Sequence, residues 1–303
     1  MMKTSAAGIA FLERHEGVVL KAYRDPVGIW TIGAGLTKAS GVVDPRPGMA
    51  LTKKQATGLL KKALANNYEP RVRKAMPGAA QHEFDGGVSF DWNLGRIHNA
   101  SWVKAWRARN WPAVERGLNA YRKAGGRVLR GLVRRRQEEF DLIRHGRYGV
   151  VKQTRPAPGL ARFVFPVDGE AILEMRGQFE TLGYAPGGDL KGLSEAAVRQ
   201  FQRDHDLTVD GIVGNATRAT LQRMIDARRK SAQAAVGAAS GGGGAGVGLQ
   251  TTDFATAEIL WVLGGLAGIA LLFAAYLAWA YRDAVAVKVQ KRLPKLAVKL
   301  RSI

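Results

Sequence analysis

The chain has 303 residues, enough for more than one compact domain, and no cysteine, which excludes disulfide scaffolds, thiol nucleophiles and thiolate zinc sites. Lys and Arg number 46 against 25 Asp and Glu, a net charge of +21, which favours an anionic partner such as nucleic acid, anionic lipid or cell wall. Residues 1–150 carry most of this excess, with 27 basic and 12 acidic side chains, a difference of +15.

Composition divides the chain into six segments, and the N-terminus lacks the long apolar stretch and the cleavage site of a signal peptide. The five histidines are scattered, with no pair at metal-ligand spacing, so neither a metal nor a cofactor is predicted. The predicted boundaries are 1–148 for a globular domain, 149–166 for a Pro-, Gly- and Arg-rich linker, 167–230 for a small helical domain, 231–256 for a Gly/Ala-rich tether, 257–282 for an apolar helix and 283–303 for a basic tail.

A short helix is predicted at the N-terminus. Thr4 or Ser5 can cap it and Gly17 can end it, which places Glu16 in its last turn. A β-rich segment follows, and residues 25–28 indicate a turn between two strands.

Three side chains in this region carry the groups that glycosidic hydrolysis needs. Glu16 ends a helix, Asp25 stands at the turn and Thr31 lies on the returning strand. One protonated carboxyl gives its proton to the leaving oxygen, while a second, ionised carboxyl orients water or stabilises the sugar cation. An Asp at a turn, a Thr in a strand and a solvated Glu at a helix end are also ordinary structural residues, so residue types alone leave both interpretations open.

The spacing of Glu16, Asp25 and Thr31, in the setting Glu-Gly, Ala-Tyr-x-Asp and Gly-x-x-Thr-Ile-Gly-x-Gly, resembles the active site of phage-type lysozymes of glycoside hydrolase family 24. Residues 84–95 resemble the family's Phe-Asp…Ser-Phe…Asn-x-Gly helix, and residues 125–139 resemble its Gly-Leu-x-x-Arg-Arg terminal helix. The resemblance extends in the right order over most of the first domain.

The resemblance implies an α+β lysozyme-like domain, mostly helical with a small β-hairpin lobe. It further implies an endolysin-type muramidase that hydrolyses the β-1,4 bond between N-acetylmuramic acid and N-acetylglucosamine in peptidoglycan. In those terms Glu16 is the general acid, Asp25 the base or electrostatic partner, and Thr31 helps to place the water.

Two departures from the family pattern concern the cleft and its sugar subsites. Gly86 and Gly87 stand where the family commonly has Ala-Leu, at a cost of up to ~1 kcal/mol for each glycine inside a helix. Residues 100–102 read Ala-Ser-Trp where members often have Ser-Thr-Leu.

A three-helix domain is predicted after the linker. Helical spacing runs to Gly183, a second helix begins at Ser194, and Thr217 opens a last helix through Leu221. The signatures Ala-Val-x-x-Phe-Gln and Val-Asp-Gly-x-x-Gly resemble those of the three-helix peptidoglycan-binding domain. Arg176 replaces the family's usual Gln, so the fold is better supported than wall affinity, and a helical spacer is the alternative.

The apolar run from residue 259 to residue 281 has no charge and predicts one transmembrane helix, since it would extend roughly 35 Å against a hydrocarbon core of about 30 Å. A buried core helix is the alternative. Seven Lys and Arg follow the run, whereas the twenty residues before it hold none, which predicts a single pass through the bacterial inner membrane with the domains on the periplasmic side. The basic tail either lies on an anionic membrane surface or is solvated.

The sequence therefore predicts a muramidase held at the membrane and wall, with peptidoglycan as substrate and binding target, for host-cell lysis or wall remodelling. Export without a signal peptide would need the span itself or a holin or lysis pore as a further partner. A catalytically silent wall-binding or anchoring protein is the first alternative. A nucleic-acid-binding protein is not expected, because no such motif accompanies the charge.

Overall fold

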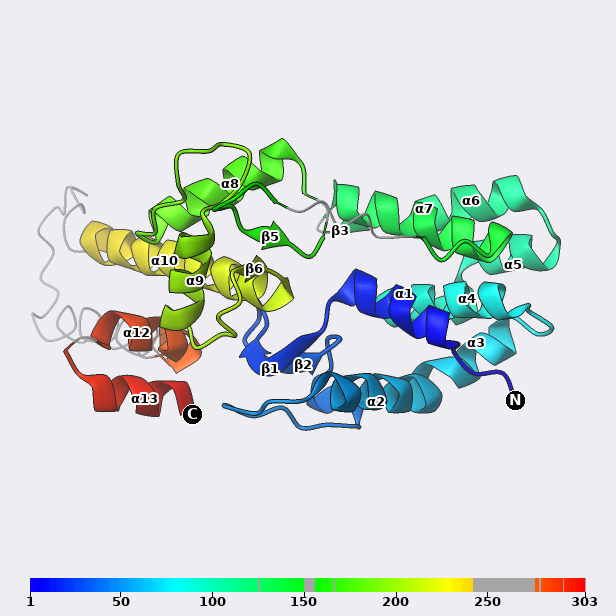
Figure 1. Ribbon diagram of the computed structural model, residues 1–303, viewed down its shortest axis with the longest axis horizontal. Helices are drawn as coiled ribbons and strands as arrows, with labels where there is room; N and C mark the ends of the chain where they lie inside the picture. Colours follow the sequence, from blue (N-terminus) through cyan, green and yellow to red (C-terminus); the bar gives the residue numbers. More distant parts are fainter. Residues whose placement is uncertain are drawn as a thin grey trace, which may run out of the picture.

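The computed structural model describes residues 1–124, 126–149, 156–165, 167–241, 276–277, 279–290 and 292–302. Figure 1 shows an elongated molecule in which the helices of the first domain occupy one half and those of the second domain the other. The β1–β2 hairpin lies between the two halves.

The first domain is mostly helical, with a small antiparallel hairpin near its N-terminus, as predicted. Its helices are α1 (Ala6–Glu16), α2 (Lys53–Ala63), α3 (Glu69–Ala75), α4 (Gln81–Leu94), α5 (Ser101–Arg107), α6 (Trp111–Asn119) and α7 (Arg130–His145). Its strands are β1 (Val19–Arg24) and β2 (Trp30–Gly33), and later β3 (Lys123–Ala124) and β4 (Arg127–Val128). Short 3-10 turns at Lys38–Ser40 and Ile97–Asn99 and a π-helical turn at Leu64–Tyr68 complete it.

The ends of α1 are those that the sequence predicts. The Ser5 hydroxyl accepts the amide hydrogen of Gly8 at 3.0 Å, which satisfies a free donor of the first turn. Gly17 follows the helix with a φ of +67°, a conformation that side chains with a Cβ rarely adopt. Glu16 is consequently the last residue of α1, where the chain turns into β1.

The core of the first domain forms around α4, which is buried along most of its length. Phe84, Val88 and Phe90 of α4 pack with apolar residues of α1, α3, α5 and α6, and α7 lies alongside. Because α4 is enclosed by other helices, its position sets where the residues at its C-terminal end lie.

The second domain contains α8 (Gly169–Thr181), α9 (Glu195–Asp204) and α10 (Asn215–Gly241), together with a short parallel pair of β5 (Arg162–Phe163) and β6 (Ile212–Val213). Its core includes Phe179, Val198 and Phe201, all fully buried. β5 falls inside the predicted linker 149–166. The amide of Ala161 donates to Leu193 O at 2.8 Å and Phe163 packs on this core, so the apolar residues among the prolines and glycines of the linker belong to the domain.

Arg176 has a structural role in the second domain. Its side chain is buried and donates to the carbonyl oxygens of Pro186, Asp189 and Gly192, at 3.3, 2.6 and 2.8 Å, and to that of Gly187. A guanidinium offers five N–H donors, which suits this ring of backbone acceptors better than the amide of Gln would. The departure from the family pattern at this position thus fixes the loop between α8 and α9.

α10 is longer than the predicted helix and continues to Gly241, inside the segment predicted as a tether. The sequence from 232 to 239 is rich in Ala, the strongest helix former, which extends the helix until the glycines begin. The remainder of the tether lies outside the described residues.

The predicted transmembrane helix 257–282 also lies mostly outside the described residues. Within the part of the chain that the structure describes, no helix is both long and apolar enough to cross a bilayer. The basic tail contains α12 (Arg282–Val289) and α13 (Pro294–Ser302).

The second domain packs against the hairpin of the first. Tyr23 of β1 is buried and belongs to the core of the second domain, and Lys21 pairs with Asp206 at 2.7 Å. Asn215, the first residue of α10, donates through its side-chain amide to the backbone carbonyl of Glu16. The end of α1 and the hairpin are therefore held from both domains.

Candidate active site

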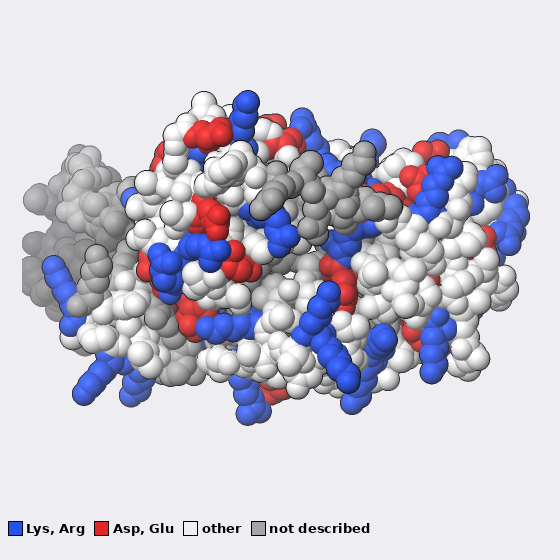
Figure 2. Space-filling model, in the orientation of Figure 1, with Lys and Arg blue, Asp and Glu red and all other residues white. Residues whose placement is uncertain are grey.

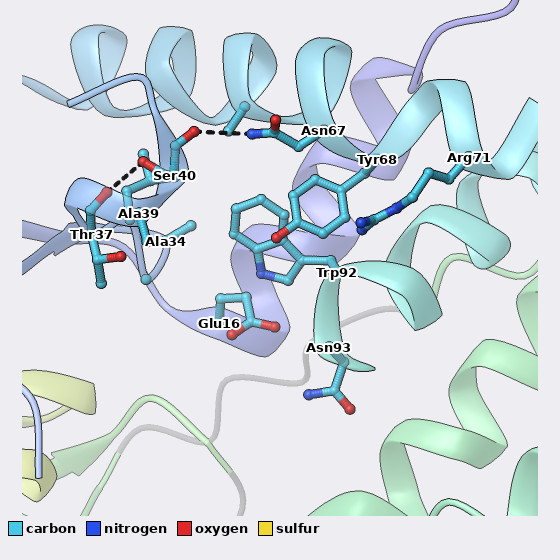
Figure 3. A pocket seen from close by; sticks show the side chains of 13 residues that line it. Glu16, Ala34, Thr37, Ala39, Ser40, Asn67, Tyr68, Arg71, Trp92 and Asn93 are labelled. Atoms are coloured by element: carbon cyan, nitrogen blue, oxygen red, sulfur yellow. Dashed lines mark hydrogen bonds between the residues drawn. The ribbon is translucent and has the colours of Figure 1, made fainter. Parts of the chain in front are cut away.

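A cavity of about 520 Å³ lies beside the C-terminal end of α1. Figure 3 shows Glu16 at its edge, with the side chains of Tyr68, Arg71 and Trp92 above it in this view. The residues that line it are Glu16, Ala34, Gly35, Leu36, Thr37, Ala39, Ser40, Ala63, Asn67, Tyr68, Arg71, Trp92 and Asn93. These come from α1, the loop after β2, the α2–α3 region and the end of α4, so the cavity is a cleft between the hairpin lobe and the helices.

Glu16 forms an ion pair at the edge of this cleft. Its Oε1 lies 2.6 Å from Nη1 of Arg135 on α7, and the two side chains are 21% and 7% exposed. Burial lowers the pKa of Arg135, but the nearby carboxylates of Glu16 and Glu139 outweigh burial and raise it overall. Arg135 therefore stays charged and fixes the orientation of the Glu16 carboxylate.

A buried polar network continues from Arg135 towards the cleft. Glu139, fully buried, accepts from Ser89 at 2.8 Å, from Arg135 at 3.1 Å and from Arg136 at 3.1 Å. Arg136 in turn donates to the side-chain oxygen of Asn93 at 2.9 Å, and Asn93 lines the same cleft as Glu16. One network thus holds residues on two sides of the cleft.

Asp25 shapes the hairpin turn. Its Oδ1 accepts the amide hydrogens of Val27 at 3.0 Å and Ile29 at 2.8 Å, which closes the turn between β1 and β2. Asp25 does not line the cavity. One carboxylate oxygen of Asp25 therefore has a structural task in the turn.

Thr31 pairs with Tyr23 across the hairpin and is 4% exposed. Its hydroxyl donates to the carbonyl oxygen of Ile29 at 3.2 Å, and it too is absent from the cavity lining. The hydroxyl thus supports the hairpin turn.

Tyr23 carries a buried phenol in the hairpin. Burial raises the pKa of its phenol to about 12, with further contributions from the negative charges of Asp25 and Glu16.

Comparison with known proteins identifies the first domain. The phage lysozyme family model matches residues 13–139. The endolysin of Salmonella phage P22 is 31% identical over 140 residues, which cover 46% of this chain and 96% of that protein. The chain belongs to the phage lysozyme family.

Other proteins are also similar to parts of the chain. The endolysin of Lactococcus phage c2 is 36% identical over 146 residues, covering 47% of this chain and 60% of that protein, so the chain spans only part of that relative. The solved endolysin of Escherichia coli O157:H7 phage FAHEc1 is 27% identical, with a TM-score of 0.44, and covers 49% of this chain and 98% of that chain. A peptidoglycan-binding domain model matches residues 168–221, as the sequence signatures predict.

Membership of this family confirms the prediction that the chain is a lysozyme-type enzyme. The roles of Glu16, Asp25 and Thr31 stay predictions. The structure places Glu16 in the cleft and the other two in the hairpin beside it. Among the described residues, no cluster of three His, Cys, Asp or Glu could hold a metal ion.

Several residues in the cleft or in contact with Glu16 were not predicted as site residues. Arg135 and Asn93 both stand in segments whose resemblance to the family was recognised, so the signal was present but gave them no role. Tyr68 and Arg71 lie in a segment without a recognised motif, and only the fold brings them to the cleft.

Proposed function

We propose that the chain is an endolysin-type muramidase that hydrolyses the β-1,4 bond between N-acetylmuramic acid and N-acetylglucosamine. The observation that carries the proposal is the position of Glu16, on a rigid helix end, at the edge of a cleft and oriented by Arg135. A bound glycan strand would run past Glu16 with the scissile oxygen within reach of its carboxyl group.

In the proposed reaction Glu16 donates its proton to the leaving oxygen as the glycosidic bond breaks. Asp25 Oδ2 stabilises the positive charge that develops on the sugar or accepts a proton from the attacking water. Arg135, whose Nη1 lies 2.6 Å from Oε1 of Glu16, holds this carboxyl group at the edge of the cleft. Thr31 supports Asp25 indirectly, because its hydroxyl helps to hold the turn on which Asp25 stands.

The test is release of muropeptides from purified sacculi by the full chain and by Glu16→Gln. We expect products with a reducing N-acetylmuramic acid end from the unaltered chain and a loss of at least about 100-fold in rate for Glu16→Gln. Glu115→Gln, a carboxylate of α6 outside the cleft lining, is the matched control and should keep the full rate. Binding to sacculi without release by either protein would make the chain a wall-anchoring protein on a lysozyme scaffold.

We also propose that the second domain binds peptidoglycan and that residues 257–282 anchor the chain in the inner membrane, with the domains in the periplasm. The uncharged run and the basic residues that follow it support this arrangement. A holin or lysis pore is the proposed partner for passage across the membrane. Lysis and wall remodelling are both compatible with such a tethered enzyme.

Single cysteines in this cysteine-free chain can test the orientation. In intact spheroplasts a membrane-impermeant maleimide should label Glu170→Cys, while Lys295→Cys should react only after permeabilisation. Labelling of both positions in intact spheroplasts would contradict the single pass with a cytoplasmic tail.

A further inference from the structure

Arg71 of α3 lies in the cleft together with two aromatic rings. The rings of Tyr68 and Trp92 are half-buried, with centroids 4.8 Å apart, and the guanidinium carbon of Arg71 lies 4.9 Å from the Tyr68 centroid. In the view of Figure 3 the two rings stand between Arg71 and Glu16. The cation is therefore separated from the proposed proton donor by an aromatic platform.

One edge of the Arg71 guanidinium is fixed by a buried acid. Nε donates to Oδ2 of Asp91 at 2.8 Å, and the side chain of Asp91 is fully buried. The other oxygen of Asp91 accepts the amide hydrogen of Ile97 at 3.0 Å, so this carboxylate is itself held in place. The guanidinium is thus anchored on the protein side.

The terminal nitrogens of Arg71 have a different environment. Among the described residues neither of them has a hydrogen-bond acceptor, and the side chain is 42% exposed. A guanidinium that is fixed along one edge and open at its ends is preorganised for an anion, and a carboxylate matches its two parallel N–H groups. Holding the side chain in advance also lowers the entropy that binding would otherwise cost.

The platform and the cation suit different parts of one ligand. The C–H face of a sugar ring can pack on Tyr68 or Trp92, as apolar surface packs on aromatic rings elsewhere. A neutral polymer of N-acetylglucosamine would use the rings but offers nothing to Arg71. A glycan whose sugars carry lactyl and peptide substituents brings carboxylates to the same cleft.

We propose that Arg71 is a specificity-determining residue that binds a carboxylate on the substituent of a sugar held against Tyr68 and Trp92. The site thereby favours carboxylated wall glycan over neutral β-1,4-linked N-acetylglucosamine polymers. This inference rests on the proposed function, because it assigns the substrate group that the same cleft recognises. The carboxylate can belong to the lactyl ether of a peptide-free sugar or to the stem peptide.

The experiment compares Arg71→Gln and Arg71→Lys with Lys74→Gln, an exposed lysine of the same helix that gives the same loss of charge. Soluble glycan strands are prepared with and without stem peptides. Each preparation is used both untreated and with its carboxylates converted to amides. Binding is measured by calorimetry on the full chain in the Glu16→Gln background, and hydrolysis on chains with Glu16. Arg71→Lys keeps a cation beside Asp91. Thermal unfolding of each variant checks that the fold is retained.

Amidation should weaken binding by the chain with Arg71 about tenfold and raise KM more than it lowers kcat. Arg71→Gln should show the same loss on untreated strands and respond little to amidation, while Lys74→Gln should behave like the chain with Arg71. The strand type on which amidation acts identifies the lactyl or the peptide carboxylate. Equal sensitivity to amidation with and without Arg71, or no sensitivity at all, would overturn the proposal.

Failure of the proposed function gives a different result. Absence of hydrolysis together with amidation-sensitive binding through Arg71 would remove the muramidase and keep the carboxylate site. Hydrolysis that does not depend on Arg71 or on amidation would keep the muramidase and remove the carboxylate site.

Discussion

At the scale of single residues, the ion pair of Glu16 with Arg135 decides how the proposed acid is presented. Arg135 is almost fully buried and also contacts Glu139, so its charge is held by two carboxylates in a site with little water. Breaking a buried pair leaves an uncompensated charge, which costs more than the pair itself contributes.

Arg135→Gln should therefore lower the free energy of unfolding by about 3 kcal/mol and reduce muropeptide release. Arg134→Gln changes the exposed neighbour on α7 and should alter stability by less than about 0.5 kcal/mol. Urea unfolding of the unaltered chain and of the two variants measures the difference in the free energy of unfolding. Equal stability of the two variants would show that the ion pair does not stabilise the fold.

The phenol of Tyr23 makes the stability of the fold depend on pH in the alkaline range. Burial and the charges of Asp25 and Glu16 raise the phenol pKa to about 12, against about 10 in the unfolded chain. The folded protein holds this proton more tightly, so the stabilisation is complete below pH 10 and is lost as the pH rises through 12. At pH 11 the loss is about 1.4 kcal/mol.

Tyr23→Phe should remove this part of the alkaline loss. The check is urea unfolding at pH 8 and pH 11 for both proteins, in which the unaltered chain should lose more stability than the variant. The same loss in both would mean that the Tyr23 phenol titrates as it does in the unfolded chain.

At the scale of elements, two glycines explain how α4 packs. A Cβ at Gly86 would stand 2.4 Å from Cγ1 of Ile143 on α7, and one at Gly87 would stand 2.6 Å from the sulfur of Met76 and 3.0 Å from Val72. The unfavourable helix propensity of glycine is thus offset by the close approach of α4 to its neighbours. The departure from the family's Ala-Leu is a packing feature of this chain.

Gly86→Ala should consequently destabilise the first domain by about 1–3 kcal/mol, although alanine is the better helix former. Gly58→Ala in α2 is the matched control, because a Cβ there meets nothing within 4 Å, and it should be neutral or stabilise by up to about 1 kcal/mol. Thermal unfolding of both variants measures these changes in stability. A stabilising effect of Gly86→Ala would show that α4 and α7 are packed less closely.

At the scale of the whole molecule, the tail folds back onto the second domain. Nε and Nη2 of Arg223 on α10 lie 2.8 and 2.9 Å from the carboxylate of Asp283 on α12, and Lys230 donates to the hydroxyl of Tyr281. Figure 2 shows Lys and Arg side chains along the edge on which α2 and α13 lie. A helix that spans a bilayer between residues 257 and 282 would separate the two partners by roughly 30 Å, so these contacts would have to open first.

Arg223→Ala should release α12 and α13 and make the basic tail a faster substrate for trypsin. Arg228→Ala, an exposed position on the same helix, should leave the rate of cleavage unchanged. The measurement is limited proteolysis of the full chain followed by mass spectrometry. Unchanged cleavage in both variants would show that the ion pair does not hold the tail.

Local signals in the sequence determined much of this protein. Ser5 and Gly17 bound α1 through contacts within a few residues, so the place of Glu16 at a helix end followed from the sequence alone. The turn at Asp25 and the signatures of the second domain are equally local. The predicted span depends on composition and lies mostly outside the described residues.

Only the tertiary structure decided which groups surround Glu16. Arg135 lies 119 residues further along the chain, and Arg71 reaches the cleft because α3 and α4 pack together. Neither the enclosure of Tyr23 by the second domain nor the task of Arg176 leaves a periodic signal in the sequence. Such contacts depend on how distant elements pack, which the pattern of neighbouring residues does not encode.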